Sequence, residues 1–248
     1  MRSGWSRALA DPTLWVAVLF VALLLGMPLL APVFRWVFPE VATPVYGRDS
    51  FLALWLSHAG MVAVASLAAT ITGVGLALFV TRPLGRDFRP IVNALATIGQ
   101  TFPPAAVLAL AVPAIGFGTK PTLIALLLYG LLPIIENAIA GLEGVSAAVR
   151  DAAEGMGLTA WQLLRDIELP LAAPAILAGV RVSVTIAIGT ATIGSTVGAL
   201  TLGTPIFDGL ATNKIPFVIQ GAVLVALFAI LTDMIFARVE RRLQIPPS

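Results

Sequence analysis

The stretch SAAVRDAAEGMGLTAWQLLRDIELP, Ser146 to Pro170, is the longest part of the chain in which charged residues recur, and long apolar segments flank it on both sides. A polar insert between apolar spans cannot lie in hydrocarbon, so we expect it to contact an aqueous partner or the membrane surface. We refer to residues 146–170 as the knob.

Local signals within the knob predict two short helices joined by a glycine turn. Ser146 is placed to cap the first helix, and Gly157 is suited to end it, because glycine turns there without a Cβ penalty. Thr159 followed by Gln162 has the spacing of a capping box, which starts the second helix. We expect this second helix to stop near Pro170.

Composition places the whole chain in a membrane. Of its 248 residues, 58% are hydrophobic and 11% are charged, which is typical of an integral membrane protein and gives one transmembrane domain, 1–248. The net charge of +2 does not favour nucleic acid binding. The chain has no cysteine, and His58 is its only histidine, so we expect no disulfide and no metal site.

Hydropathy predicts an all-α protein with about six transmembrane helices, each needing about 20 apolar residues. The expected spans are 14–34, 52–80, 91–113, 121–142, 171–201 and 216–237. Ten Lys and Arg residues lie on the side that carries both termini and the knob, against four on the other side, with Arg181 inside a span. The positive-inside rule therefore predicts that the knob and both termini are cytoplasmic.

The chain lacks a phosphate-binding loop of the form G-x-x-x-x-G-K-[ST]. We therefore expect no cofactor in this chain and no catalytic residue, and any ATP and Mg²⁺ to be bound by a partner chain.

Polar residues in two spans are candidates for a solute path, because such paths show polar faces and helix breaks. In the third span these are Asn93, Gln100 and Thr101, followed by Pro103, where we expect a kink. The alternative is that these groups only bond neighbouring helices.

The fifth span has a hydroxyl-bearing stripe with Thr192, Ser195 and Thr196 as candidate path residues. Two possible buried charges, Glu136 in the fourth span and Arg181 in the fifth, need an ion pair or a route to the interface by snorkelling.

Four tryptophans sit near predicted membrane edges in a belt pattern, which is not an aromatic cage for a cation. They are Trp5, Trp15, Trp36 and Trp55.

The knob resembles the EAA loop of ABC importer permeases, whose pattern is E-A-A-x3-G-x9-I-x-L-P. The matching residues are Asp151, Ala152, Ala153, Gly157, Ile167, Leu169 and Pro170. The one departure is an aspartate in place of the usual glutamate, which keeps the charge but shortens its reach. The resemblance implies that these residues dock into a groove on a cytoplasmic ATPase.

Over nearly the whole chain, segments such as GQTFPP (Gly99 to Pro104) and ELPLAAPAILAGVR (Glu168 to Arg181) resemble permeases of osmoprotectant importers. This resemblance implies a type I ABC importer (MetI-like) fold in the bacterial inner membrane. It also implies a cargo such as glycine betaine, choline or a related quaternary ammonium compound. The partners it implies are an ATPase dimer, a second permease subunit, identical or homologous, and an extracytoplasmic solute-binding protein.

Three other functions stay open from the residues alone. One is an importer permease for another small polar solute, and another is a transporter that uses no ATP. The third is an intramembrane serine hydrolase with Ser195 as its nucleophile. The base would have to be His58, because the chain has no other histidine.

Overall fold

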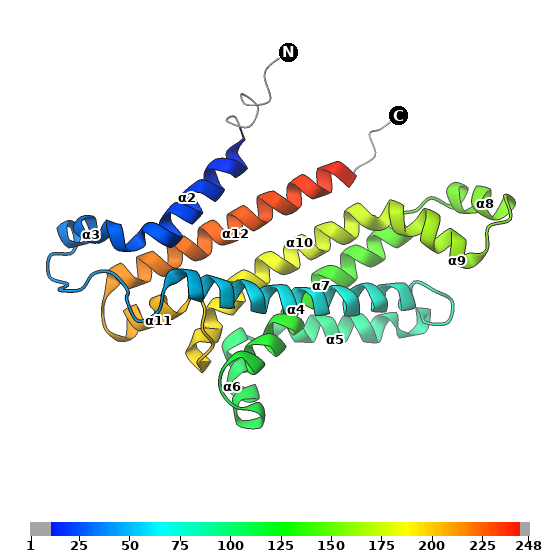
Figure 1. The fold of residues 1–248 in the computed structure, drawn as a ribbon. Helices are drawn as coiled ribbons and strands as arrows, with labels where there is room; N and C mark the ends of the chain where they lie inside the picture. Colours follow the sequence, from blue (N-terminus) through cyan, green and yellow to red (C-terminus); the bar gives the residue numbers. More distant parts are fainter. Residues whose placement is uncertain (1–10, 244–248) are drawn as a thin grey trace, which may run out of the picture. The chain divides into compact units, whose positions relative to one another are not determined.

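The computed structural model describes residues 11–243, and these form helices joined by short connections, with no strand within that range (Figure 1). Trp5 of the predicted belt lies outside the described residues, as do Arg2 and Arg7, which the positive-inside count included. In chain order the α-helices are α2 (Pro12–Gly26), α3 (Ala31–Val37), α4 (Phe51–Val80), α5 (Arg89–Thr101), α6 (Pro104–Ile115), α7 (Thr119–Glu143), α8 (Ala147–Gly155), α9 (Ala160–Gln162), α10 (Leu169–Ile193), α11 (Thr204–Ala211) and α12 (Ile215–Leu243). Short 3-10 helices cover Met27–Leu30, Arg86–Phe88 and Gly194–Val197, and a π-helix covers Leu163–Glu168.

Among the described residues, five helical segments are long and apolar enough to cross a membrane. They are Pro12–Val37, Phe51–Val80, Thr119–Glu143, Ala160–Val197 and Ile215–Leu243. A sixth crossing is available if α5 and α6 together make one broken span. The predicted all-α membrane architecture of about six spans is thereby confirmed.

The expected helix break lies at Phe102 and Pro103. Phe102 has an extended backbone (φ −65°, ψ 135°), as residues before proline prefer, and it ends α5. Pro104 then begins α6, where a missing backbone N–H costs nothing because the first turn has no acceptor for it. Two successive prolines therefore divide this span into two helices.

The chain forms two compact units, each assembled from separate segments. The first unit takes the described part of Met1–Ala63 together with Pro104–Ala125 and Ile188–Ile235. The second unit takes Val64–Pro103, Leu126–Ala187 and the described part of Phe236–Ser248.

The first unit has a core of aromatic and large aliphatic residues. The rings of Phe20, Trp55 and Phe228 contact one another, with centroids 5.8 to 6.1 Å apart. Trp55 thus packs against this core, whereas Trp15 and Trp36 are exposed, and the belt at the membrane edges stays a prediction. The protein gains apolar burial by packing Trp55 against these rings.

Two neutral buried side chains hold the first unit together through backbone groups. Gln220 accepts a hydrogen bond from the Tyr46 backbone N–H at 3.0 Å and donates to the Pro44 carbonyl at 2.7 Å. His58 lies 3.1 Å from the Ile188 carbonyl through Nε2, and its Nδ1 accepts from the Leu202 N–H at 3.2 Å. Buried polar side chains are stabilising only when paired in this way.

The loop that Gln220 holds also carries a buried phenol. Tyr46 Oη donates a hydrogen bond to Asp49 Oδ2 at 3.0 Å. Burial, together with this nearby carboxylate, raises the pKa of Tyr46, so its hydroxyl stays a donor at physiological pH.

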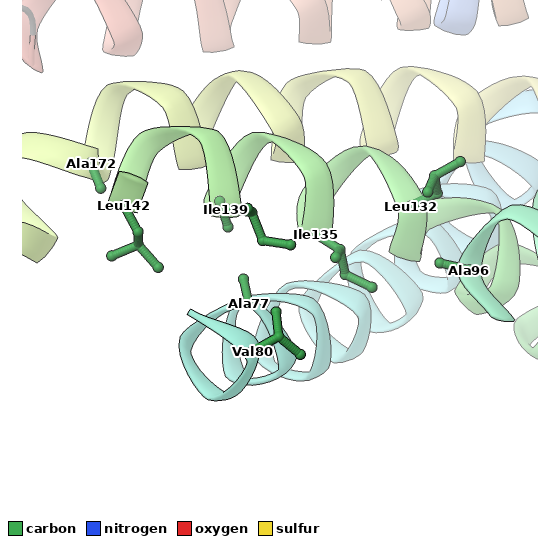
Figure 2. Packing of buried hydrophobic residues seen from close by; sticks show 9 residues of the cluster. Ala77, Val80, Ala96, Leu132, Ile135, Ile139, Leu142 and Ala172 are labelled. Carbon is green, nitrogen blue, oxygen red and sulfur yellow. The ribbon is translucent and has the colours of Figure 1, made fainter. Parts of the chain in front are cut away.

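The second unit has an aliphatic core to which α4, α5, α7 and α10 contribute (Figure 2). Small residues let these helices approach closely: Ala77 on α4, Ala96 on α5 and Ala172 on α10 face larger side chains of α7 such as Ile135 and Leu142. Small residues in contact positions are the usual means of helix packing in membranes.

Candidate functional site

The first helix of the knob, α8, begins and ends as its sequence predicts. The Ser146 hydroxyl accepts a hydrogen bond from the Val149 N–H, which caps the helix. Gly157 has a left-handed backbone (φ 81°), and its N–H bonds the Glu154 carbonyl at 2.9 Å. The Leu158 N–H bonds the Ala153 carbonyl, which completes a Schellman motif. The glycine turn is therefore fixed by local chemistry.

The second helix also starts as predicted, with the Thr159–Gln162 capping box formed in both directions. It does not stop at Pro170, which corrects our expectation: Ala160–Val197 forms one helical segment that continues through the proline into α10 (Figure 1). The π-helix accounts for this, because the Leu169 N–H bonds Leu164, five residues back. A proline ring clashes with a regular α-turn, and the wider π-turn gives it room.

The knob residues divide into a buried side and an exposed side. Ala153 and Leu163 are buried, and Ile167 and Leu169 are half-buried. Asp151, Ala152, Gly157 and Pro170 are exposed.

Two large apolar residues, Met156 and Trp161, are 72% and 65% exposed at the tip of the knob. Asp151 has no ion-pair or hydrogen-bond partner within residues 11–243, so its carboxylate is available to another molecule. Exposed large apolar residues and an unpaired carboxylate in one short insert are typical of a protein-binding surface.

The base of the knob contains a charged cluster to which sequence reasoning assigned no role. The Glu168 carboxylate is 2% exposed and lies 2.5 Å from Arg82 through Oε2 and 3.0 Å from Arg150 through Oε1. Arg150 also donates to the Leu142 carbonyl at 2.7 Å. The available signal was a glutamate directly before the Leu-Pro pair that opens a long apolar segment, where an unpaired charge is costly.

The predicted path residues of the third span lie on and just after α5. Asn93 and Gln100 are half-buried, and Thr101 and Pro103 are exposed. The Asn93 side-chain oxygen is buried and has no hydrogen-bond partner among the described residues. The Thr101 hydroxyl donates to the Ile98 carbonyl of its own helix.

The predicted path residues of the fifth span lie at the C-terminal end of α10 and in the 3-10 turn after it. Thr192 and Ser195 are half-buried, and Thr196 is exposed. All three hydroxyls donate to carbonyls of the preceding turn, at 2.7 to 3.2 Å. The hydrogen of each hydroxyl is therefore already used within the preceding turn.

The two charges predicted inside spans are not paired with each other. Arg181 is half-buried and lies 3.3 Å from Glu240 of α12. Glu136 is exposed on α7, which corrects the expectation of a buried charge. It lines a cavity of about 270 Å³ together with Asn93, Arg89 and Glu143. Of these, Arg89 and Glu143 form an ion pair.

Comparison with known families decides the class of this protein. Residues 69–245 match the family described as the binding-protein-dependent transport system inner membrane component. The chain belongs to this family. The protein is therefore a multi-pass membrane permease, a transport component of an ABC importer system, and the knob is part of it.

Relatives of the permease carry names from osmoprotectant transport. The permease is 41% identical over 192 residues to the osmoprotectant import permease protein OsmY of Salmonella typhimurium, covering 77% of this chain and 81% of that one. It is 40% identical over 187 residues to the carnitine transport permease protein OpuCD of Listeria monocytogenes, covering 75% and 83%. It is 38% identical over 182 residues to the glycine betaine/carnitine/choline permease protein OpuCB of Bacillus subtilis, covering 71% and 84%.

Solved structures support the fold of the permease. A chain of the MetNI methionine ABC transporter, in an inward-facing conformation, matches with a TM-score of 0.68 at 20% identity. The match covers 80% of this chain and all of that one. The permease therefore has the type I importer fold.

Proposed function

We propose that this permease carries osmoprotectants with a quaternary ammonium group, such as glycine betaine, carnitine or choline, as a subunit of an ABC importer. The names of relatives at about 40% identity support this cargo. The observation that carries the mechanism is the knob, in which Asp151, Met156 and Trp161 are all exposed.

We propose that a separate ATPase dimer grips the knob and hydrolyses ATP, with Mg²⁺ bound to that partner and no cofactor in this chain. The exposed apolar tip supplies contact area, and Asp151 supplies a charge that a basic groove would recognise. Closure of the ATPase would then favour one conformation of the permease over the other.

High-affinity recognition of the cargo belongs to an extracytoplasmic binding protein. A quaternary ammonium group is usually held by open aromatic faces, but Phe20, Trp55 and Phe228 pack on one another in the core. A second permease subunit, identical or homologous, completes the path.

Each unit contributes its own candidate path residues: Asn93, Gln100, Thr101 and Pro103 in the second unit, and Thr192, Ser195 and Thr196 in the first. Neutral hydroxyl and amide groups can interact with a passing cation without trapping it. The break at Pro103 would let α5 and α6 move separately.

The experiment that tests this function is uptake into proteoliposomes that hold the permease with its co-purified ATPase and second permease subunit. With the binding protein outside and ATP inside, radiolabelled glycine betaine, carnitine or choline should accumulate, and methionine should not compete. Uptake that needs no ATP would contradict the proposal, and so would covalent labelling of Ser195 by a serine-reactive phosphonate.

The orientation follows from the distribution of Lys and Arg, which places the knob and both termini in the cytoplasm. Because the chain has no cysteine, a Met156→Cys variant gives a single labelling site at an exposed position. A membrane-impermeant maleimide should label it in inside-out vesicles and not in intact cells. Labelling in intact cells would overturn the orientation.

A further inference from the structure

The cluster around Glu168 joins four elements at one buried carboxylate. Glu168 itself is the last residue of the π-helix at the base of α10. Arg82 follows the C-terminal end of α4, and Arg150 belongs to α8. Through Leu142, Arg150 also bonds the last turn of α7, where a cation is favoured by the helix dipole. The chain just after α4, the last turn of α7, α8 and the base of α10 are therefore linked at Glu168.

Static stability does not account for this arrangement. A buried ion pair adds little net stability, because desolvation offsets the attraction. The cluster also leaves donors unused among the described residues. Arg82 Nε is buried without an acceptor, and Arg150 Nε lies close to the carboxylate without the alignment of a hydrogen bond. A cluster built only for rigidity would have every donor satisfied.

The helix that carries Glu168 connects the exposed tip to the interior. Trp161 lies on α9, and from there the helical segment Ala160–Val197 continues through the π-helix into α10. π-helical turns are rare and concentrate at functional sites, since the extra residue per turn weakens the regular hydrogen-bond ladder. The π-helix thus lies between the tip and α10, and its last residue is the one held by both arginines.

We propose that Glu168 is a positioning residue for transport. It fastens the knob to α4, α7 and α10, so that a movement imposed on the tip is passed to all three helices together. This inference rests on the proposed function, in which an ATPase grips the knob. Without the carboxylate, the tip would move with the ATPase while α4 and α7 lag behind.

The test compares Glu168→Gln with Glu143→Gln in the reconstituted importer. Both variants remove one charge from a glutamate paired with arginine, but Glu143 is 47% exposed and Glu168 is 2% exposed. We measure ATP hydrolysed and glycine betaine taken up in the same vesicles. The ratio of ATP to solute should rise about tenfold in Glu168→Gln and stay within about twofold of wild type in Glu143→Gln.

The ratio separates positioning from a merely structural role. Loss of assembled importer lowers hydrolysis and uptake together and leaves the ratio unchanged, which would overturn the inference. If Glu168→Gln does not assemble, Arg82→Gln takes its place, because it keeps the Arg150–Glu168 pair. Its ATP-to-solute ratio should lie between the wild-type ratio and about ten times that ratio. An unchanged ratio would contradict the proposal.

A second measurement needs the permease alone, so it stays informative if the proposed function fails. Spin labels at Leu84→Cys and Met156→Cys occupy positions that are 87% and 72% exposed, in a chain with no native cysteine. Glu168→Gln should broaden the distribution of distances between them, and Glu143→Gln should not. Equal widths would overturn the inference, whereas an absence of ATP-driven uptake in wild type would overturn only the proposed function.

Discussion

The two compact units hold their buried polar groups in different ways. In the first unit, Gln220 and His58 are neutral, and each bonds backbone groups directly. In the second unit, Glu168 is charged and is held by two long arginine side chains that are each 36% exposed. Neutral side chains that bond the backbone fix a structure, whereas a charged cluster with solvent access can exchange its contacts. This difference is what the proposed role of Glu168 requires of the second unit.

The largest expected effect is the loss of one cation from the buried cluster. Arg150→Met keeps the length of the side chain but removes the ion pair to Glu168 and the bond to the Leu142 carbonyl. Because Arg82 still pairs with the carboxylate, we expect the free energy of unfolding to fall by about 2–3 kcal/mol, somewhat less than for an isolated buried charge. Thermal unfolding of the permease in detergent measures it. A loss below about 1 kcal/mol would mean that the cluster behaves like an exposed pair.

A comparable change in the first unit tests the hydrogen bonds of its neutral buried side chains. Gln220→Met keeps the volume but leaves the Tyr46 N–H and the Pro44 carbonyl buried without a partner. We expect a loss of about 2 kcal/mol, because each orphaned group costs its desolvation. This loss should not change with salt, whereas that of Arg150→Met should shrink as salt screens the charges. Equal salt dependence would remove the distinction between the units.

The sequence predicts those features of the knob that depend on near neighbours. The Ser146 cap, the Gly157 turn and the Thr159–Gln162 box each form within five residues of chain, so local chemistry determines them. The break at Pro103 was equally local, since proline restricts the residue before it.

The features that sequence reasoning missed depend on distant residues. Arg82 and Glu168 are 86 positions apart, and no local pattern pairs them. Pro170 was expected to stop a helix, but the π-turn ahead of it lets the helix continue. Glu136 was predicted as a possible buried charge because it lies in a span, yet which face of α7 is exposed could not be read from composition. The family and fold were predictable because the motif spacing is specific; the cluster that holds the knob was not.

A third probe uses backbone strain, with one glycine in each unit. Gly157 and Gly198 both have left-handed backbones, with φ of 81° and 85°, and neither has an atom that blocks an added methyl group. Alanine at either position should cost about 1 kcal/mol, because only glycine adopts this conformation freely. Thermal unfolding should show similar losses for both variants.

The two variants should differ in transport. Gly157→Ala changes the turn between α8 and α9 and should raise the ATP-to-solute ratio, whereas Gly198→Ala should lower uptake and hydrolysis together. Gly155→Ala is a matched control in the knob, since Gly155 has no positive φ and has open space around it. A normal ratio in Gly157→Ala would mean that the turn need not be rigid for coupling.

The smallest expected effect comes from the exposed ion pair of the second unit. Arg89 donates to both carboxylate oxygens of Glu143 through Nη1 and Nη2, but the two side chains are 39% and 47% exposed. Glu143→Gln should therefore cost no more than about 0.5 kcal/mol, because water solvates the unpaired arginine and exposed pairs contribute little. A loss as large as that of Arg150→Met would show that exposure does not separate the two pairs. Burial would then no longer explain why Glu168, and not Glu143, is suited to transmit movement from the knob.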